Sequence, residues 1–273
     1  MVETLIICHR GENLKQMIHL LTIPGRQVLS FLRQAGQMTL FLLKALVVMP
    51  LPPYRPANLL KQIHFIGPHS LFVILLTALF AGMVLGLQGY YTLSRFGSEA
   101  MLGPMVALAM IQELGPVLTA LMITGRAGSA MAAELGIMRI REQVDALQTM
   151  GINPMGHLIV PRLLAGIFVF PLLTAIFNVV GILGGYLVAV QLMGMSSGTY
   201  YGEIQAKVDM DDIHMSLIKS LVFGLLVTWV CAFKGYTTGR GAEGVGRATT
   251  SAVVLSSVLV LVVDYVITSI MVN

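Results

Sequence analysis

Two long runs without Asp, Glu, Lys or Arg constrain how this chain can fold. One lies between Lys61 and Arg95, and the other lies between Arg162 and Glu203. Each exceeds the ~20 residues that a helix needs to cross the apolar core of a bilayer. Of the 273 residues, 56% are hydrophobic, and the mean hydropathy of +0.83 is too high for a soluble domain. The sequence therefore predicts an all-α polytopic membrane protein. Strand-period alternation, which a membrane β-barrel needs, is absent.

The placement of basic residues decides how many spans the second run contains. We predict five spans, at about 69–93, 103–124, 161–190, 214–233 and 250–271. With one span after Arg162, 14 Lys and Arg lie on one side, and only Arg95, Lys207 and Lys219 lie on the other. With two spans there, Lys234, Arg240 and Arg247 would change places with Lys207 and Lys219, and the bias falls to 13 against four. The positive-inside rule favours the single span, with a cytoplasmic amino end and an external carboxyl end.

The first 56 residues are predicted to form a separate segment. Residues 14–49 carry apolar side chains at helical spacing, interrupted by Lys15, Arg26, Arg33 and Lys44. Basic side chains on an otherwise apolar helix suit the headgroup boundary, so we expect an interfacial helix on the cytoplasmic face. The prolines of MPLPPYRP (49–56) end that helix. The membrane domain then covers residues 57–273.

No enzyme motif stands in the context that its chemistry needs. The sequence has no HExxH or CxxC, its six His are scattered, and its two Cys share no short motif. One match to GxSxG, GMSSG (194–198), follows an apolar span rather than the strand that a serine nucleophile needs. We therefore expect no catalytic residue and no metal site. The glycine-rich segment 234–248 is more typical of a flexible turn than of a phosphate-binding loop. No Lys follows a Gly, so the GxxxxGK[ST] nucleotide motif is absent.

Three charged residues fall inside predicted spans, where ionised groups are costly. At about 1.5 Å per residue, Glu113 lies about 15 Å from the outer end of span two. Lys219 lies about 8 Å into span four and Asp264 about 10 Å from the outer end of span five. One hypothesis is a buried charge network that braces the outer part of the bundle. The alternative is that Lys219 reaches the headgroups and only one acid is buried.

A polar stretch of about 30 residues, 125–154, separates spans two and three, far longer than a simple connection needs. Read as one helix, it places Ile137, Ile140, Val144 and Leu147 on a narrow apolar face. One interpretation is an amphipathic helix that rests on the membrane surface. The other is a docking helix that a soluble partner binds.

Five segments of the chain carry a family resemblance: LQGY (87–90), QELGPVLTALMITGRAGSAMAAELG (112–136), EQVDALQTMGINP (142–154), PRLLAG (161–166) and GRATTSAVV (246–254). Together they resemble the MlaE/YrbE permease family, the membrane subunits of ABC-type phospholipid transporters that work with MCE proteins. The likeness covers nearly all of the chain after residue 60.

The resemblance implies a homodimer in the bacterial inner membrane and a separate cytoplasmic ATPase that binds ATP and Mg. It also implies a STAS-domain subunit and a periplasmic MCE-protein hexamer. The implied function is to move glycerophospholipid between the inner and outer membranes, which maintains outer-membrane lipid asymmetry. Two alternatives remain open: an MCE-linked permease for another hydrophobic substrate such as a sterol, and a non-transporting anchor for an MCE protein.

The resemblance also implies roles for individual residues. The segment Glu134–Leu147 matches the coupling helix that enters a groove on the ATPase, and positions that line a lipid cavity at the dimer interface also have counterparts. Where close relatives can carry Arg, this chain has Gln112, which leaves Lys219 as the candidate partner of Glu113. The coupling residues are Glu134, Ile137, Met138, Arg139, Ile140, Glu142 and Leu147, and the lipid-binding residues are Leu85, Leu93, Phe96 and Glu113.

Overall fold

A computed structural model describes residues 29, 32–49, 56–239 and 241–271. The chain divides into two compact units, Met1–Val47 and Val48–Asn273. Every regular element among the described residues is helical, so the all-α prediction is confirmed. In the first unit the described residues from 32 onward are helical, and Met38, Phe41 and Ala45 are buried at helical spacing. The rest of the predicted interfacial segment lies outside the described residues.

Five helical stretches of the second unit are long and apolar enough to cross a membrane, as predicted. The run after Arg162 forms one span followed by a short separate helix, α9 (Ser197–Lys207), so the single-span interpretation is confirmed. The first stretch comprises α2 (Pro56–Ile66) and α3 (Pro68–Ser94). The second comprises η1 (Glu99–Met101), α4 (Leu102–Leu108), η2 (Ala109–Leu114), α5 (Gly115–Ile123), η3 (Thr124–Gly128) and α6 (Ser129–Ile140). The third comprises η4 (Met155–Ile159), α8 (Val160–Tyr186) and η5 (Leu187–Leu192), the fourth is α10 (Met210–Tyr236), and the fifth is α11 (Gly241–Met271).

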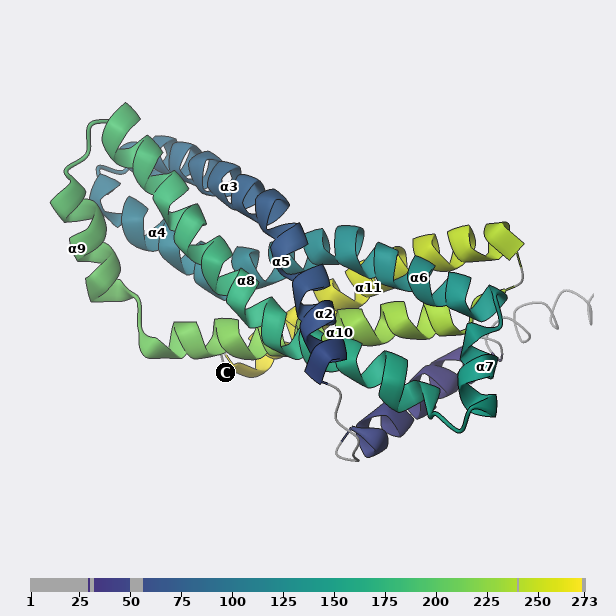
Figure 1. Cartoon of the computed structure of the whole chain (residues 1–273). Helices are drawn as coiled ribbons and strands as arrows, with labels where there is room; N and C mark the ends of the chain where they lie inside the picture. The colour runs from purple at the N-terminus through teal and green to yellow at the C-terminus, as the bar shows by residue number, and fades with distance from the viewer. Residues whose placement is uncertain (1–28, 30–31, 50–55, 240, 272–273) are drawn as a thin grey trace, which may run out of the picture. The chain divides into compact units, whose positions relative to one another are not determined.

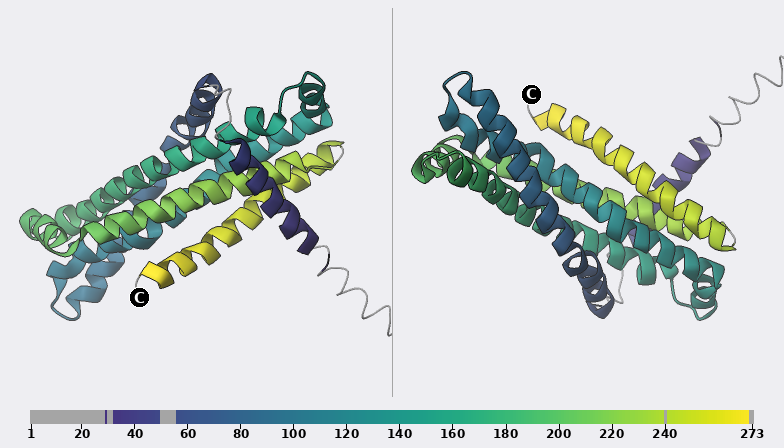
Figure 2. Two further views of the ribbon diagram at one scale, coloured as in Figure 1. Left: turned by 90° about the horizontal axis from the view of Figure 1, so that it is seen from below. Right: turned by 90° about the horizontal axis from the view of Figure 1, so that it is seen from above.

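Helices α8 and α10 form the centre of the second unit, and α3 packs closely along α8 (Figures 1 and 2). Small residues allow this close approach. A Cβ added at Gly82 would collide with the backbone of Gly181, and one added at Gly86 would meet the backbone of Gly185 at 3.1 Å. Lipid-embedded helices associate through such close backbone packing, because burying apolar surface gains little when lipid is the solvent.

The two ends of this unit differ in structure. Helices α9 and α4 pack together at one end, and α6 and α7 (Gln143–Thr149) lie at the other (Figure 1). We call them the α9 end and the α7 end. At the α9 end, Tyr200 is fully buried and its hydroxyl donates to the backbone oxygen of Ile182 at 3.1 Å. Burial raises the pKa of Tyr200 well above its usual range, so the hydroxyl keeps the proton that it donates.

The carboxyl-terminal end of span two differs from the prediction. We expected span two to end near Thr124, but the helical stretch runs from Glu99 to Ile140. The reason is packing, because α6 buries Met131, Ala132 and Leu135 on one face, and this helix packs on α10 and α11. The polar stretch therefore begins as a continuation of span two rather than as a separate helix.

Candidate functional site

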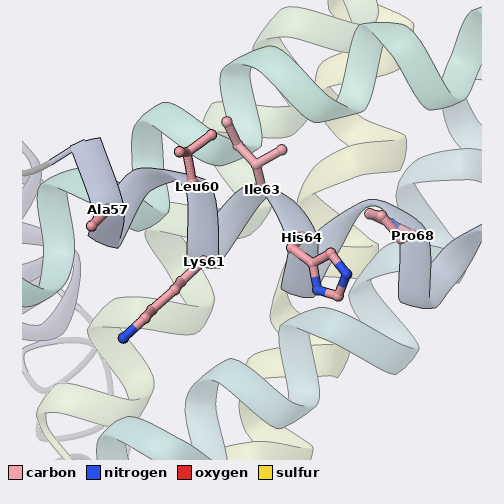
Figure 3. A pocket seen from close by; sticks show the side chains of 6 residues that line it. All are labelled: Ala57, Leu60, Lys61, Ile63, His64 and Pro68. Atoms are coloured by element: carbon pink, nitrogen blue, oxygen red, sulfur yellow. The ribbon is translucent and has the colours of Figure 1, made fainter.

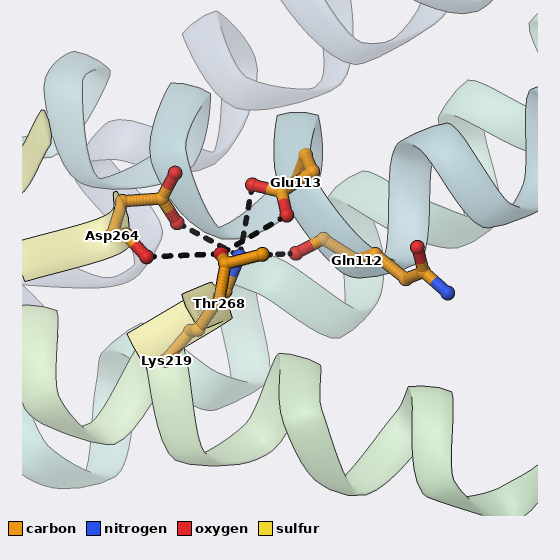
Figure 4. Close-up of polar contacts among 5 residues, drawn as sticks. All are labelled: Gln112, Glu113, Lys219, Asp264 and Thr268. Atoms are coloured by element: carbon orange, nitrogen blue, oxygen red, sulfur yellow. Dashed lines mark hydrogen bonds and ion pairs between the residues drawn. The ribbon is translucent and has the colours of Figure 1, made fainter. Parts of the chain in front are cut away.

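The three charged residues inside the spans meet in one cluster (Figure 4). Lys219 Nζ lies 2.8 Å from Glu113 Oε2 and 2.9 Å from Asp264 Oδ1. The Thr268 hydroxyl lies 3.1 Å from Glu113 Oε1 and 2.9 Å from the backbone oxygen of Asp264. The cluster therefore connects η2 of span two with α10 and α11, the arrangement expected from the depths of the three residues.

Burial differs sharply within this cluster. The side chain of Lys219 is 0% exposed, whereas that of Asp264 is 16% exposed and that of Glu113 is 41% exposed. Lys219 therefore does not extend to the surface, and the alternative in which it reaches the headgroups is wrong. A buried ammonium needs opposite charge and hydrogen-bond acceptors around it. Here it has two carboxylates and one backbone carbonyl.

The local sequence explains why the backbone carbonyl of Gln112 can accept a hydrogen bond from Lys219. Lys219 Nζ donates to the backbone oxygen of Gln112 at 2.8 Å. Pro116 lies four residues further on and has no amide hydrogen, so the usual helical hydrogen bond to that oxygen cannot form. The chain adopts the π-helical turn η2 at this point. Such turns are often found at functional sites, and this one carries both Gln112 and Glu113.

The side chain of Gln112 points away from Glu113. Its Nε2 donates to Asp212 Oδ1 at 2.7 Å. Asp212 also belongs to the capping box that begins α10, in which its carboxylate accepts from the backbone amide of Asp209. Gln112 therefore joins span two to the start of span four, and among the described residues the cation paired with Glu113 is Lys219.

Each of the four residues predicted to contact lipid is at least partly exposed in the single chain. Leu85 and Leu93 are half-buried along the second half of α3, Phe96 is 77% exposed just beyond it, and Glu113 belongs to the charge cluster. A groove of about 710 Å³ lies elsewhere, along α2, lined by Ala57, Leu60, Lys61, Ile63, His64 and Pro68 (Figure 3).

The predicted coupling helix Glu134–Leu147 is not one helix. Helix α6 ends at Ile140, and α7 begins at Gln143. Between them Glu142 has φ 56°, a left-handed conformation that turns the chain. The apolar face predicted for a single helix is divided as a result. Ile137 and Ile140 are exposed on α6, whereas Val144 of α7 is buried.

Two ion pairs hold this region in place. Arg162, which is 2% exposed, reaches Glu134 Oε2 at 2.9 Å and the backbone oxygen of Leu158 at 2.6 Å. Arg139 reaches Asp145 Oδ1 at 2.6 Å across the break between α6 and α7. Of the predicted coupling residues, Glu134 and Arg139 thus have partners within the chain. Met138 and Leu147 are half-buried, and Glu142 is exposed.

Arg126 makes a contact that was not predicted from the sequence. Its guanidinium donates to the backbone oxygen of Phe65 at 2.7 Å and lies over the Phe65 ring, 5.3 Å from the centroid. This contact links span two to the end of α2. A basic residue close after an apolar span was the available signal, but only the fold identifies its partner.

The sequence matches the family described as Permease MlaE over residues 59–270. It is 42% identical to the intermembrane phospholipid transport system permease protein MlaE of Haemophilus influenzae, with 93% of this chain and 98% of that protein covered. A probable ABC transporter permease protein of Rickettsia felis is 40% identical, with 92% and 97% covered. The chloroplast protein TRIGALACTOSYLDIACYLGLYCEROL 1 of Arabidopsis thaliana is 38% identical, with 86% and 65% covered. The chain therefore belongs to the MlaE permease family.

Proposed function

We propose that this chain is the membrane subunit of an ABC transporter that moves glycerophospholipid between the inner and outer membranes and so maintains outer-membrane lipid asymmetry. The observation that carries the proposal is the 42% identity to the Haemophilus influenzae permease across 98% of its length, because that protein's name states intermembrane phospholipid transport. Two copies form the membrane part of the transporter, with one ATPase bound to each.

We assign the α7 end to the cytoplasm. Most described Lys and Arg of the second unit lie toward that end, as the positive-inside rule requires, whereas Arg95 and Lys207 lie toward the α9 end. The described basic residues toward the α7 end are Lys61, Arg126, Arg139, Arg141, Arg162, Lys234 and Arg247. In this orientation the carboxyl end is periplasmic.

The ATPase docks on the exposed surface around the break between α6 and α7. Ile137 is 44% exposed and Ile140 is 38% exposed there, next to the Arg139–Asp145 pair. Apolar anchors bordered by charges are typical of protein interfaces, in which the charges set orientation. Because α6 continues span two, a movement imposed on this surface reaches the membrane part directly.

Lipid occupies a cavity between two copies, lined by Leu85, Leu93, Phe96 and Glu113. Exposed or half-buried apolar side chains along α3 support this, because a second copy can enclose a surface that one chain leaves open. A periplasmic MCE hexamer then receives or supplies lipid, and a STAS-domain subunit completes the cytoplasmic part. ATP and Mg bind to the ATPase.

A different lipid class has one observation in its favour. The Arabidopsis thaliana relative is named for trigalactosyldiacylglycerol, a glycolipid rather than a phospholipid. Mass spectrometry of the lipid that co-purifies with the complete complex separates these substrates. Glycerophospholipid is the expected result, and a sterol or glycolipid would contradict the proposed substrate.

Reconstitution tests the transport function itself. The complete complex in donor vesicles, with acceptor vesicles carrying the MCE partner, should transfer labelled phospholipid only when ATP is hydrolysed. Transfer without ATP hydrolysis would contradict an ATP-driven transporter. No transfer with ATP present, or purification of the chain with the MCE protein but never with an ATPase, would favour the non-transporting anchor.

A further inference from the structure

The groove along α2 is a second candidate lipid site, separate from the cavity proposed above. Helix α2 turns sharply away from the direction of α3 at Gly67 and Pro68, and it packs on α8 (Figure 1). Its other face is open, and Leu60 is 64% exposed there. A half-apolar helix that lies across the direction of a span is typical of the membrane–water interface.

The apolar and the basic side chains that line the groove lie on different sides of it (Figure 3). Leu60 and Ile63 point to one side of α2, whereas Lys61 and His64 point to the other (Figure 3). His69 fixes this polar side, because its Nδ1 lies 3.0 Å from the backbone oxygen of His64 and the two rings meet edge-on at 4.9 Å. The groove thus offers an apolar strip beside a cation.

Among the described residues that line the groove, Lys61 carries a positive charge and none is acidic. Helix α2, PANLLKQIHFI, contains no acidic residue. The Arg126 guanidinium lies against Phe65 at the end of this helix. The acid Glu134 is already paired with the buried Arg162. An apolar strip, a flexible lysine and a positive surrounding together match a phospholipid with a net negative headgroup, since lysines near a membrane surface attract such lipids.

We propose that the α2 groove binds an anionic phospholipid, with the phosphate on Lys61, the headgroup beside His64, and an acyl chain along Leu60 and Ile63. In the orientation proposed above this lipid belongs to the cytoplasmic leaflet. Only the leaflet depends on that orientation. Arg126 connects the site to span two, so the bound lipid stabilises the position of α2 against the helix that carries α6.

Photo-crosslinking tests this site. The full chain is placed in phosphatidylcholine nanodiscs that contain phosphatidylglycerol with a diazirine in its acyl chain, and labelled peptides are mapped by mass spectrometry. Residues 57–68 should be labelled saturably, and unlabelled phosphatidylglycerol should displace the probe. Lys61→Gln should weaken apparent binding about fivefold, which corresponds to one lysine at an anionic surface. Lys61→Arg should restore binding.

Lys207→Gln is the matched control, because Lys207 is also exposed but lies on α9 at the other end. It should leave labelling of residues 57–68 unchanged. Equal labelling by a phosphatidylcholine probe, or equal behaviour of Lys61→Gln and Lys207→Gln, overturns the proposal. Displacement by millimolar inorganic phosphate also overturns it, because the groove would then recognise a free anion. None of these outcomes depends on lipid transport, so this site and the proposed function can fail separately.

Discussion

Lys219 Nζ lies 2.9 Å from Asp264 Oδ1, and this ion pair joins spans four and five within the bundle. The same ammonium also contacts Glu113 of span two, and its side chain is fully buried. The Lys219 ammonium thus links span four to spans two and five through its contacts with the carboxylates of Glu113 and Asp264. The cost of burying an ion makes such a cluster sensitive to the loss of any member.

Lys219→Ala should lower the free energy of unfolding by about 3–5 kcal/mol, because it leaves two carboxylates without their cation. Denaturant unfolding in detergent measures the change. Glu113→Ala and the double variant complete a cycle, in which we expect a coupling energy above about 1 kcal/mol. Lys207→Ala on α9 is the control and should change stability by less than about 0.5 kcal/mol. Fully additive effects of the two substitutions would contradict a bracing role for the cluster.

Gly82→Ala should destabilise the contact between α3 and α8 by about 3 kcal/mol or more, because the added Cβ would collide with the backbone of Gly181 rather than with a side chain that can move. Gly246→Ala is the matched control in α11, where nothing lies within 4 Å of the added Cβ. That change should be neutral or stabilising by up to about 1 kcal/mol. Thermal unfolding compares the two, and equal effects would exclude close packing at Gly82.

Glu142→Gly should be neutral or stabilising by up to about 1 kcal/mol, because glycine adopts the left-handed conformation found at this position without strain. Glu142→Val should destabilise by about 1–2 kcal/mol, because a β-branched residue adopts that conformation poorly. The melting temperatures of the purified variants measure both effects. If glycine and valine behaved alike, the turn between α6 and α7 would not depend on the backbone of residue 142.

Glu134→Gln should destabilise the chain by about 1–3 kcal/mol, because it removes the carboxylate from the buried guanidinium of Arg162, although the Glu134 side chain is itself 43% exposed. The control is Arg247→Gln, which removes an ion pair whose side chains are 81% and 79% exposed. Exposed pairs contribute about 0–1 kcal/mol. Chemical denaturation of both variants checks the difference, and a similarly small loss for Glu134→Gln would show that the pair with Arg162 is not a stabilising link.

Features that follow from helix periodicity and charge were predictable from the sequence. The rise per residue placed Glu113, Lys219 and Asp264 at similar depth, and they do meet. The positive-inside bias correctly favoured one span after Arg162. Both predictions rest on properties of single helices in a bilayer, which tertiary packing does not overturn.

Features that depend on tertiary contacts were not predictable. Span two continues to Ile140 because small and apolar residues of α6, including Ala132 and Leu135, are buried where α6 packs against α10 and α11. The break at Glu142 has no glycine or proline to mark it. The partner of Gln112 is Asp212, 100 residues away, and only the fold brings the two together.

Arg139 offers the most direct test of coupling between the ATPase and lipid movement. ATP hydrolysis and phospholipid transfer are measured together in vesicles that hold the complete complex with Arg139→Glu. We expect a folded chain that has lost lipid-dependent ATP hydrolysis and transfer. The variant Arg139→Glu with Asp145→Arg re-forms the ion pair within the chain but reverses the charges offered to a partner, and it should remain uncoupled. Normal rates in Arg139→Glu, or full recovery in the paired variant, would contradict docking of the ATPase at this surface.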